Sequence, residues 1–201
     1  MARTLGSEAV DQVSQPGRRV MIGWTGQGAG SAQSLPRELS LSEDRSALVQ
    51  RFAPELEKLR TTTLRGAGAD ATAARGAVAD ATLRCEVVAT FADVSGALTL
   101  MDDSAGSNVT ISLSYDFVVV DATSLGNTHA RAGPTPPARP DGSYEIHAFV
   151  DGPILEVIVN NRTALIVYVD PSTTNVGVSA PESANLRVWP LADPGHNYTM
   201  P

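Results

Sequence analysis

Between residues 83 and 191 the chain is a succession of short runs rich in valine, isoleucine, threonine, leucine and aromatic residues. Glycine, aspartate, asparagine or serine separates most runs from the next. Side chains of this kind favour pleated, half-buried strands, and the separating residues favour turns. The runs are LRCEVVATF, GALTLMD, NVTISLSYDFVVVD, YEIHAFV, ILEVIV, TALIVYV and NLRVWPL. About seven strands with no helical run between them predict an all-β fold, an antiparallel β-sandwich.

The segment from 144 to 169 contains three of these runs and two turn signals. Asp151-Gly152 separates the first two runs, and Asn160-Asn161, which tolerates positive φ, separates the last two. The three runs are therefore predicted to be successive antiparallel strands. The last two are apolar at nearly every position, which is typical of strands covered on both faces. The sandwich is thus expected to pack against more protein on the outside of one sheet.

Asp151 and Glu156 are two carboxylates in this otherwise apolar segment, and one hypothesis is that they form an acid–base pair. In a strand, Glu156 shares a face with Ile154 and Ile158. Because Asp151 and Glu156 are separated by an odd number of positions, an extended chain would point them to opposite faces. A glycosidase pair must converge to roughly 5–10 Å. Structural roles are therefore predicted for both, with Asp151 at a turn.

The first 60 residues contain fewer apolar runs. GRRVMIGWTG (17–26) and SLPRELSL (34–41) predict a strand pair, with Pro36 at the edge or start of a strand. In SALVQRFAPELEKLR (46–60) the apolar residues are near helical spacing, but Pro54 breaks any long helix. A short helical or irregular crossing segment is predicted there.

Two segments lack the apolar residues that a packed element needs. Residues 61–82 are built mainly from Ala, Gly, Thr, Asp and Arg and are predicted to be a linker. Residues 131–142, RAGPTPPARPDG, are predicted to be an exposed, mobile proline-rich loop. The expected organisation is an N-terminal part (1–60), the linker, the sandwich (83–192) and a tail (193–201).

The formal net charge of −7 argues against nucleic acid or an anionic membrane as a partner, because both bind basic faces. No apolar run reaches the roughly 18 residues of a membrane span. The first residues lack the apolar core of a secretory signal, and localisation is left open. Cys85, the single cysteine, allows no intrachain disulfide and is expected to be a small buried hydrophobe. The histidines show no ligand spacing, so no metal or cofactor is predicted; they are His129, His147 and His196.

Several segments together resemble the C-terminal part of glycoside hydrolase family 32, the invertase and β-fructofuranosidase family. GRRVMIGWTG and SLPRELSL resemble the last strands of the family's five-bladed propeller, and QRFAPELEKLR resembles the linker that follows. FVVVDATSLG is similar to the family's Val-Asp-Arg-Ser-x-Ser-Gly turn, with Ala122 in place of the arginine. HAFVDGPILEVIVNN resembles the sandwich segment Val-Asp-x-Ser-x-x-Glu-Val-Phe-x-Asn, and LRVWPL resembles the closing strand. The resemblance covers residues 17–60 and about 83–191, in the family's order.

The resemblance implies that a remnant of the last propeller blade, in residues 1–60, precedes the sandwich and that a propeller covers it. The family places an aspartate nucleophile in Trp-Met-Asn-Asp-Pro-Asn-Gly, a glutamate acid/base in Glu-Cys and a stabilising aspartate in Arg-Asp-Pro. None of these motifs occurs here, since Cys85-Glu86 has the reverse order and Val169 and Ala192 precede the two Asp-Pro pairs. No catalytic residue is therefore predicted, and this chain alone is not expected to hydrolyse sucrose or fructans.

Two further kinds of site are candidates. Trp24 is a candidate sugar contact, because flat aromatic surfaces stack on sugar rings; the alternative is that it packs inside the protein. Three sequons are candidate glycosylation sites, at Asn108, Asn161 and Asn197. Asn161 is expected to be the most accessible of them, because it lies at the predicted hairpin turn.

The expected function is that of a non-catalytic sandwich portion of a β-fructofuranosidase-like hydrolase, packed against the propeller domain. A rim that contacts sucrose or fructan, and a contact between copies in a homo-oligomer, are further roles compatible with this reading. Residues 1–60 would expose surface that normally lies inside the propeller, which predicts self-association or marginal stability. The alternatives are a free-standing lectin-like module that binds a glycan without catalysis and a plain interaction domain. Titration with sucrose, inulin and levan separates the lectin-like module from the expected function.

Overall fold

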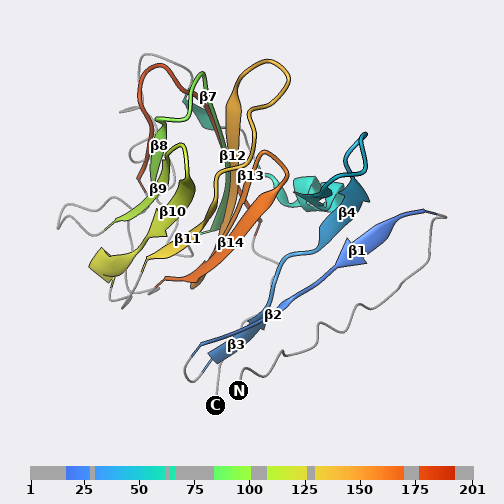
Figure 1. The fold of residues 1–201 in the computed structure, drawn as a ribbon. Coiled ribbons are helices and arrows are strands. Elements are labelled where there is room, and N and C mark those ends of the chain that lie inside the picture. The colour runs from blue at the N-terminus through green and yellow to red at the C-terminus, as the bar shows by residue number, and fades with distance from the viewer. Residues whose placement is uncertain are drawn as a thin grey trace, which may run out of the picture.

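The structure is a computed structural model that describes residues 17–27, 30–61, 64–66, 84–100, 108–125, 130–169 and 177–192. These residues form antiparallel β-sheets with two short 3-10 helices, η1 (Pro54–Leu59) and η3 (Thr123–Leu125), as the all-β prediction requires (Figure 1). No helix among the described residues is both long enough and apolar enough to cross a membrane.

The larger sheet of the sandwich has six strands in the order β14-β13-β12-β7-β16-β6. Its strands are β6 (Leu64–Gly66), β7 (Arg84–Phe91), β12 (Tyr144–Asp151), β13 (Ile154–Val159), β14 (Thr163–Tyr168) and β16 (Asn185–Pro190). The predicted three-stranded meander is β12–β13–β14. Its turns use the residues that tolerate positive φ, with Gly152 at 55°, Asn160 at 46° and Asn161 at 56°.

The second sheet has five strands in the order β11-β10-β9-β8-β15. They are β8 (Ala97–Leu100), β9 (Val109–Leu113), β10 (Phe117–Asp121), β11 (Arg131–Pro134) and β15 (Val178–Ser179). Alternate residues of both sheets meet in one buried cluster, so the two sheets pack face to face as a sandwich (Figure 1). Cys85 lies in this cluster with no exposed surface, as predicted.

The N-terminal strands form two further sheets, and one of them lies against the outer face of the six-stranded sheet. A three-stranded sheet in the order β1-β4-β5 consists of β1 (Arg19–Met21), β4 (Arg37–Leu41) and β5 (Leu48–Phe52). A separate two-stranded ribbon consists of β2 (Trp24–Gln27) and β3 (Gly30–Gln33). We call residues 34–61, which contain β4, β5 and η1, the arm.

A second apolar cluster joins the arm to the six-stranded sheet. Phe52 and Leu56 of the arm are buried there with Phe149 and Ile158 of the sheet. Partly buried residues pack around them: Leu35, Leu59, Ala164 and Leu191. The prediction that one sheet is covered on both faces is therefore confirmed, and the cover comes from the chain's own N-terminal residues.

Three segments differ from the prediction. Leu48–Phe52 is a strand although its apolar residues are near helical spacing, because pairing with β4 outweighs a local pattern that Pro54 already interrupts. Leu64–Gly66, within the predicted linker, pairs with β16; most of residues 61–82 lie outside the described part. Arg131–Pro134, within the predicted proline-rich loop, is an edge strand beside β10, where a terminal proline disrupts no central ladder. The sandwich sheets consequently contain more strands than the seven predicted.

Candidate functional site

Three buried side chains lie in one row across the outer face of the six-stranded sheet. In the strand register Phe149 of β12 is opposite Glu86 of β7 on one side and Glu156 of β13 on the other. Neighbours in register point to the same face, and the residues on either side of each belong to the sandwich core. Both carboxylates are almost fully buried, at 1% and 2% exposed. We call Glu86, Phe149 and Glu156 the acidic row.

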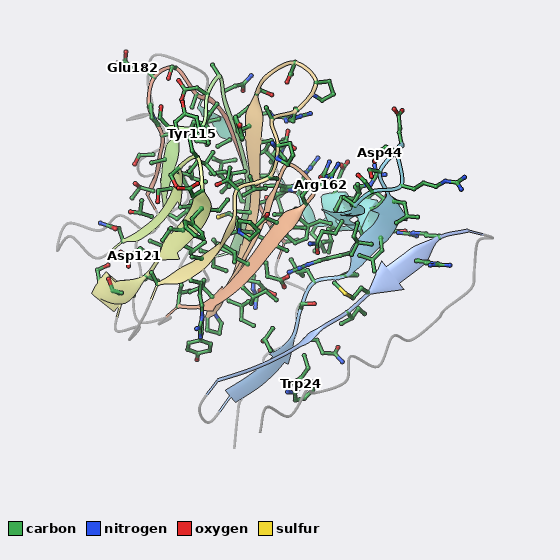
Figure 2. The ribbon with its side chains drawn as sticks, in the orientation of Figure 1. Trp24, Asp44, Tyr115, Asp121, Arg162 and Glu182 are labelled. Carbon is green, nitrogen blue, oxygen red and sulfur yellow. The ribbon has the colours of Figure 1, made fainter. Side chains whose placement is uncertain are left out.

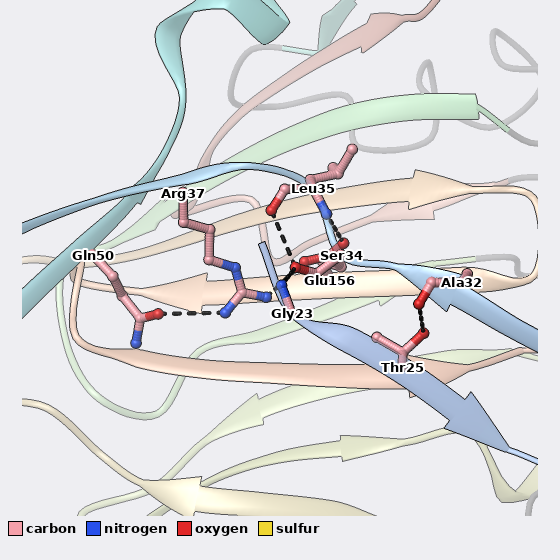
Figure 3. A network of polar contacts seen from close by, with 8 residues as sticks. All are labelled: Gly23, Thr25, Ala32, Ser34, Leu35, Arg37, Gln50 and Glu156. Carbon is pink, nitrogen blue, oxygen red and sulfur yellow. Dashed lines mark hydrogen bonds and ion pairs between the residues drawn. The ribbon is translucent and has the colours of Figure 1, made fainter. Parts of the chain in front are cut away.

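Glu156 is held by two groups of the arm (Figure 3). Nη2 of Arg37 donates to Oε2 at 2.6 Å, and the backbone N–H of Leu35 donates to Oε1 at 2.5 Å. Both carboxylate oxygens are thus satisfied in a place that excludes water. Such a pair is favourable only because desolvation of both charges is offset by short, charge-assisted hydrogen bonds.

Hydrogen bonds extend from the Arg37–Glu156 pair to Gln50 of β5, and further hydrogen bonds lie at the base of the β2–β3 ribbon (Figure 3). Nη1 of Arg37 donates to Oε1 of Gln50 at 3.3 Å, and Nε2 of Gln50 donates to the carbonyl of Arg162 in the β13–β14 turn at 2.8 Å. At the base of the ribbon, the Gly23 N–H donates to Oγ of Ser34 at 2.7 Å, and the Ser34 N–H donates to the Gly23 carbonyl at 2.8 Å. The network therefore ties β4, β5 and the ribbon to the sandwich.

Glu86, at the other end of the row, is held by Arg60 in a bidentate pair. Nε of Arg60 donates to Oε2 at 2.6 Å and Nη2 donates to Oε1 at 2.7 Å. Nε2 of His147 lies 2.8 Å from Oε1, and since a carboxylate only accepts, this nitrogen carries the proton. Burial favours a higher pKa for Glu86, but the hydrogen bonds with Arg60 and His147 outweigh it and hold the pKa below its ordinary value. The guanidinium of Arg60 also lies 4.2 Å from the ring centroid of Trp189.

This arrangement of paired charges supports a structural role. Each carboxylate is buried, is paired with an arginine and has a hydrogen bond at both of its oxygens, so neither is open to a substrate. Burial, together with the charge of Glu86, raises the pKa of the Cys85 thiol to about 12, so this cysteine is not a nucleophile near neutral pH. Among the described residues no group of three or more His, Cys, Asp or Glu is placed to hold a metal ion.

Asp151 and Glu156 lie on the same face of the sheet, so the prediction of opposite faces is wrong. Asp151 pairs in register with Ile154, which is two positions from Glu156 on the same strand. The chain reverses through Gly152 and Pro153, so Asp151 and Glu156 lie on neighbouring antiparallel strands. Their faces therefore follow from the strand register and not from the number of positions between them. The two carboxylates nevertheless have different partners. Nε of Arg84 lies 3.2 Å from Asp151 at the surface, whereas Glu156 is buried against Arg37.

Trp24 does not pack inside the protein. It lies on the ribbon, labelled in Figure 2, and its side chain is 71% exposed. In register it is opposite Gln33, and the ribbon has no other strand beside it among the described residues. Its surface is thus accessible to a ligand, and contact with a sugar stays a prediction.

The sequons differ in their surroundings. Asn161 is exposed in the β13–β14 turn, where its backbone carbonyl accepts from the Gln50 N–H at 2.8 Å. Asn108 is half-buried, and its Oδ1 accepts from Oγ1 of Thr110 at 3.4 Å. Asn197 lies outside the described residues, as do His129 and His196. Use of any sequon stays a prediction.

The sequence predicts a structural role for Glu156 but did not reveal the Glu86 end of the row. One signal for it was present, because Glu86 is a charged residue inside the apolar run LRCEVVATF. The same signal had drawn attention to Glu156 in ILEVIV. Arg60 and His147, the partners of Glu86, lie 26 and 61 positions away from it along the chain, and no local pattern connects them.

No family model matches the sequence, and no curated protein matches it. Solved structures do match. The GH32 β-fructofuranosidase of Bombyx mori aligns with a TM-score of 0.67 and 15% identity, covering 89% of this chain and 39% of that chain. The exo-inulinase of Aspergillus awamori aligns with a TM-score of 0.66 and 17% identity, covering 88% of this chain and 41% of that chain. The fructan 1-exohydrolase IIa of Cichorium intybus aligns with a TM-score of 0.67 and 12% identity, covering 88% of this chain and 46% of that chain.

The chain has the fold of part of a glycoside hydrolase family 32 enzyme. The resemblance inferred from the strand motifs is therefore confirmed at the level of the fold. The chain spans only 39% to 46% of the length of these family 32 structures, as a C-terminal portion would.

Proposed function

We propose that this chain is the C-terminal, non-catalytic portion of a β-fructofuranosidase-like family 32 hydrolase. The observation that carries the proposal is the extent of the match, which takes in nearly nine-tenths of this chain but less than half of each enzyme. Residues 1–60 are then the end of the catalytic propeller with the linker segment that follows it, residues 61–82 an Ala/Gly-rich linker and residues 83–192 the sandwich. Hydrolysis of sucrose or fructan is an activity of the whole enzyme, on residues that this chain does not contain.

The acidic row supports a specific role for the sandwich in that enzyme. Arg37 and Arg60 come from segments that resemble the last propeller strand and the linker, and both end in buried carboxylates of the sandwich. An interface with buried, hydrogen-bonded ion pairs fixes orientation more strictly than apolar contact alone. The sandwich then acts as a rigid support for the propeller's last blade.

A hydrolysis assay tests the catalytic part of the proposal. The purified chain is incubated with sucrose, inulin and levan, with an active family 32 invertase as positive control. We expect no fructose release above that of a heat-denatured sample, because no nucleophile and acid pair is available. Fructose release above that background would contradict the proposal.

A second test addresses whether the chain is one portion of a longer product. The transcript upstream of the Met1 codon is sequenced. An in-frame Asn-Asp-Pro-Asn-Gly segment is expected, since the family's nucleophile lies there. An upstream in-frame sequence without any propeller-like segment would contradict it.

The exposure of Trp24 favours a second candidate, a lectin-like role in which this side chain stacks on a sugar. Tryptophan fluorescence reports on it, because the chain has two tryptophans and Trp189 is buried. Saturable quenching by inulin or levan that disappears in Trp24→Ala would support this role. An unchanged spectrum up to high ligand concentration would exclude it.

A further inference from the structure

The proline-rich segment from Pro134 to Pro140 begins at the end of β11 and leads towards β12. Its sequence is PTPPARP, in which two prolines three positions apart are followed two positions later by an arginine. Proline fixes its own φ at about −65° and keeps the residue before it out of the helical region. Every residue of the segment except Ala138 is a proline or precedes one. The segment is therefore constrained to an extended, polyproline II conformation.

One edge of this segment consists of proline rings that face outwards. Three residues complete one turn of polyproline II, so residues three positions apart share an edge. Pro134, Pro137 and Pro140 share such an edge, and all three are exposed. Pro136 is buried, so it anchors the segment to the sandwich by another edge.

Hydrogen bonds to the sandwich hold the segment in this extended form. The carbonyl of Pro134 accepts from Oγ1 of Thr163 at 2.5 Å, and the carbonyl of Pro137 accepts from Nδ2 of Asn160 at 2.8 Å. Polyproline II has no internal hydrogen bonds, so contacts of this kind fix its position. Because the segment is already ordered, a partner that binds it loses little affinity to the ordering of a loop.

Exposed aromatic side chains continue the apolar surface beside the proline edge. Tyr115, labelled in Figure 2, is 89% exposed and Phe117 is 54% exposed. In register Phe117 is opposite Pro134, so the two side chains lie on the same face of the sheet. Oγ1 of Thr135 donates to the carbonyl of Ser114 at 2.6 Å, which ties the segment to the turn that carries these aromatic residues. Contiguous exposed apolar surface is typical of a protein-interaction site.

Arg139 adds a positive charge near the end of the proline edge. Its Nη1 donates to Oε2 of Glu145 at 2.6 Å, and the two side chains are 40% and 20% exposed. An ion pair that water reaches contributes little to stability, so Arg139 can exchange this carboxylate for one on a partner at low cost. The complementary surface is thus an aromatic-lined groove for the prolines with an acidic pocket for the arginine.

We propose that the segment from Pro134 to Pro140, together with Tyr115 and Phe117, is a docking surface for a polyproline-binding domain of the SH3 type. Such a domain binds Pro-rich segments in an aromatic-lined groove. The groove contacts Pro134 and Pro137 along the exposed edge, and acidic residues beside it pair with Arg139. This inference does not rest on the proposed function, because the surface belongs to the sandwich itself and takes part in no reaction.

The test is bio-layer interferometry with the full chain and a purified SH3 domain that selects Pro-x-x-Pro-x-Arg peptides. Saturable binding at micromolar concentrations is expected. The binding should weaken as the salt concentration rises, because an arginine meets an acidic pocket. Absence of saturable binding by the full chain would overturn the proposal.

Variants show which side chains the domain contacts. Pro134→Ala/Pro137→Ala and Arg139→Gln are each expected to bind roughly tenfold more weakly, and Arg139→Gln should also lose most of the salt dependence. Pro181→Ala and Arg131→Gln are matched controls, because both residues are exposed and lie outside the motif. The controls should bind as the wild type does, and thermal unfolding checks that each variant is folded. Undiminished binding of Arg139→Gln or of a folded double proline variant would overturn the proposal, as would equal losses in the controls.

Discussion

Glu156 and Glu38 both pair with arginine, but only Glu156 is buried. The side chains of Arg37 and Glu156 are 5% and 3% exposed, whereas those of Arg18 and Glu38 are 25% and 23% exposed. Water screens the second pair and can replace either partner. Removing one partner of the first leaves a charge stranded in the interior, so similar contact distances have different consequences.

The first prediction compares these two carboxylates by substitution. Glu156→Gln is expected to lower the free energy of unfolding by about 3 kcal/mol, because Arg37 keeps its charge in a buried place without a counter-charge. Glu38→Gln is the matched control and is expected to cost less than about 1 kcal/mol. Urea unfolding followed by circular dichroism measures both. Equal losses of unfolding free energy in the two variants would show that burial does not decide how much each ion pair contributes to stability.

The second prediction concerns pH. The pKa of Glu86 is held below its ordinary value in the folded protein, so its contribution to stability is present above the unfolded pKa of about 4.3. That contribution is lost as the pH falls through the lower, folded pKa. The difference in unfolding free energy between the wild type and Glu86→Gln should therefore be largest near neutral pH and shrink below about pH 4.

Urea titrations between pH 3 and pH 7 measure this difference. Glu182→Gln serves as the control, because Glu182 is exposed and its replacement should change stability little at any pH. A wild-type advantage over Glu86→Gln that stays constant down to pH 3 would contradict the linkage.

At the scale of elements, strand β7 uses both of its faces. Cys85, Val87 and Ala89 point into the sandwich core, while Glu86 points to the arm. One strand can serve two interfaces because alternate side chains leave on opposite sides. The turn after β7 is equally constrained, since Gly96 lies against the ring of Phe91 at the end of the strand.

The third prediction tests this turn. A Cβ at position 96 would overlap Cδ1 of Phe91, and Phe91 is buried and cannot swing into water. Gly96→Ala is expected to destabilise the protein by about 1–3 kcal/mol through overpacking. If the clash is the cause, the double variant with Phe91→Leu should lose less than the sum of the two single losses. Additive losses in thermal or urea unfolding would point to another cause.

At the scale of the whole molecule, the sandwich exposes Tyr115, Phe117 and Tyr168, but more of the exposed large apolar side chains lie in the N-terminal part. Large apolar side chains are exposed there, at Ile22, Trp24, Leu41 and Leu48. Leu41 and Leu48 are directly opposite each other in register, and together they form a small apolar patch at the end of the β4–β5 hairpin. Exposed apolar strands of this kind favour association with other chains.

The fourth prediction is that the chain self-associates through this end. Static light scattering is expected to show a mass that rises with concentration, and the Leu41→Ser/Leu48→Ser variant should stay closer to the monomer mass. Tyr115→Ser is a control, because Tyr115 is highly exposed but lies on the sandwich, away from the arm (Figure 2). A monomer at all concentrations would contradict the expectation of self-association.

Much of the fold follows from local patterns. Alternation and β-branched residues predict the strands of the meander, and Gly152 and Asn161 mark its turns correctly. The candidate site was predictable only at Glu156, whose charge stands out in an apolar strand. The face of Asp151 was predicted wrongly, because counting positions ignores the reversal of the chain at a hairpin.

The amino-acid sequence by itself determined that this chain forms β-strands, where its main hairpins turn and that one of its sheets is covered on both faces. These properties depend on side chains close together along the chain, and the alternation of side chains between the two faces of a strand makes them predictable from the sequence. Only the tertiary structure decided that Arg37 meets Glu156 across 119 positions and that Arg60 meets Glu86. The physical reason is that a buried charge requires a counter-charge, but any arginine in the chain could in principle supply it. The packing of the arm on the sheet determines which arginine does so.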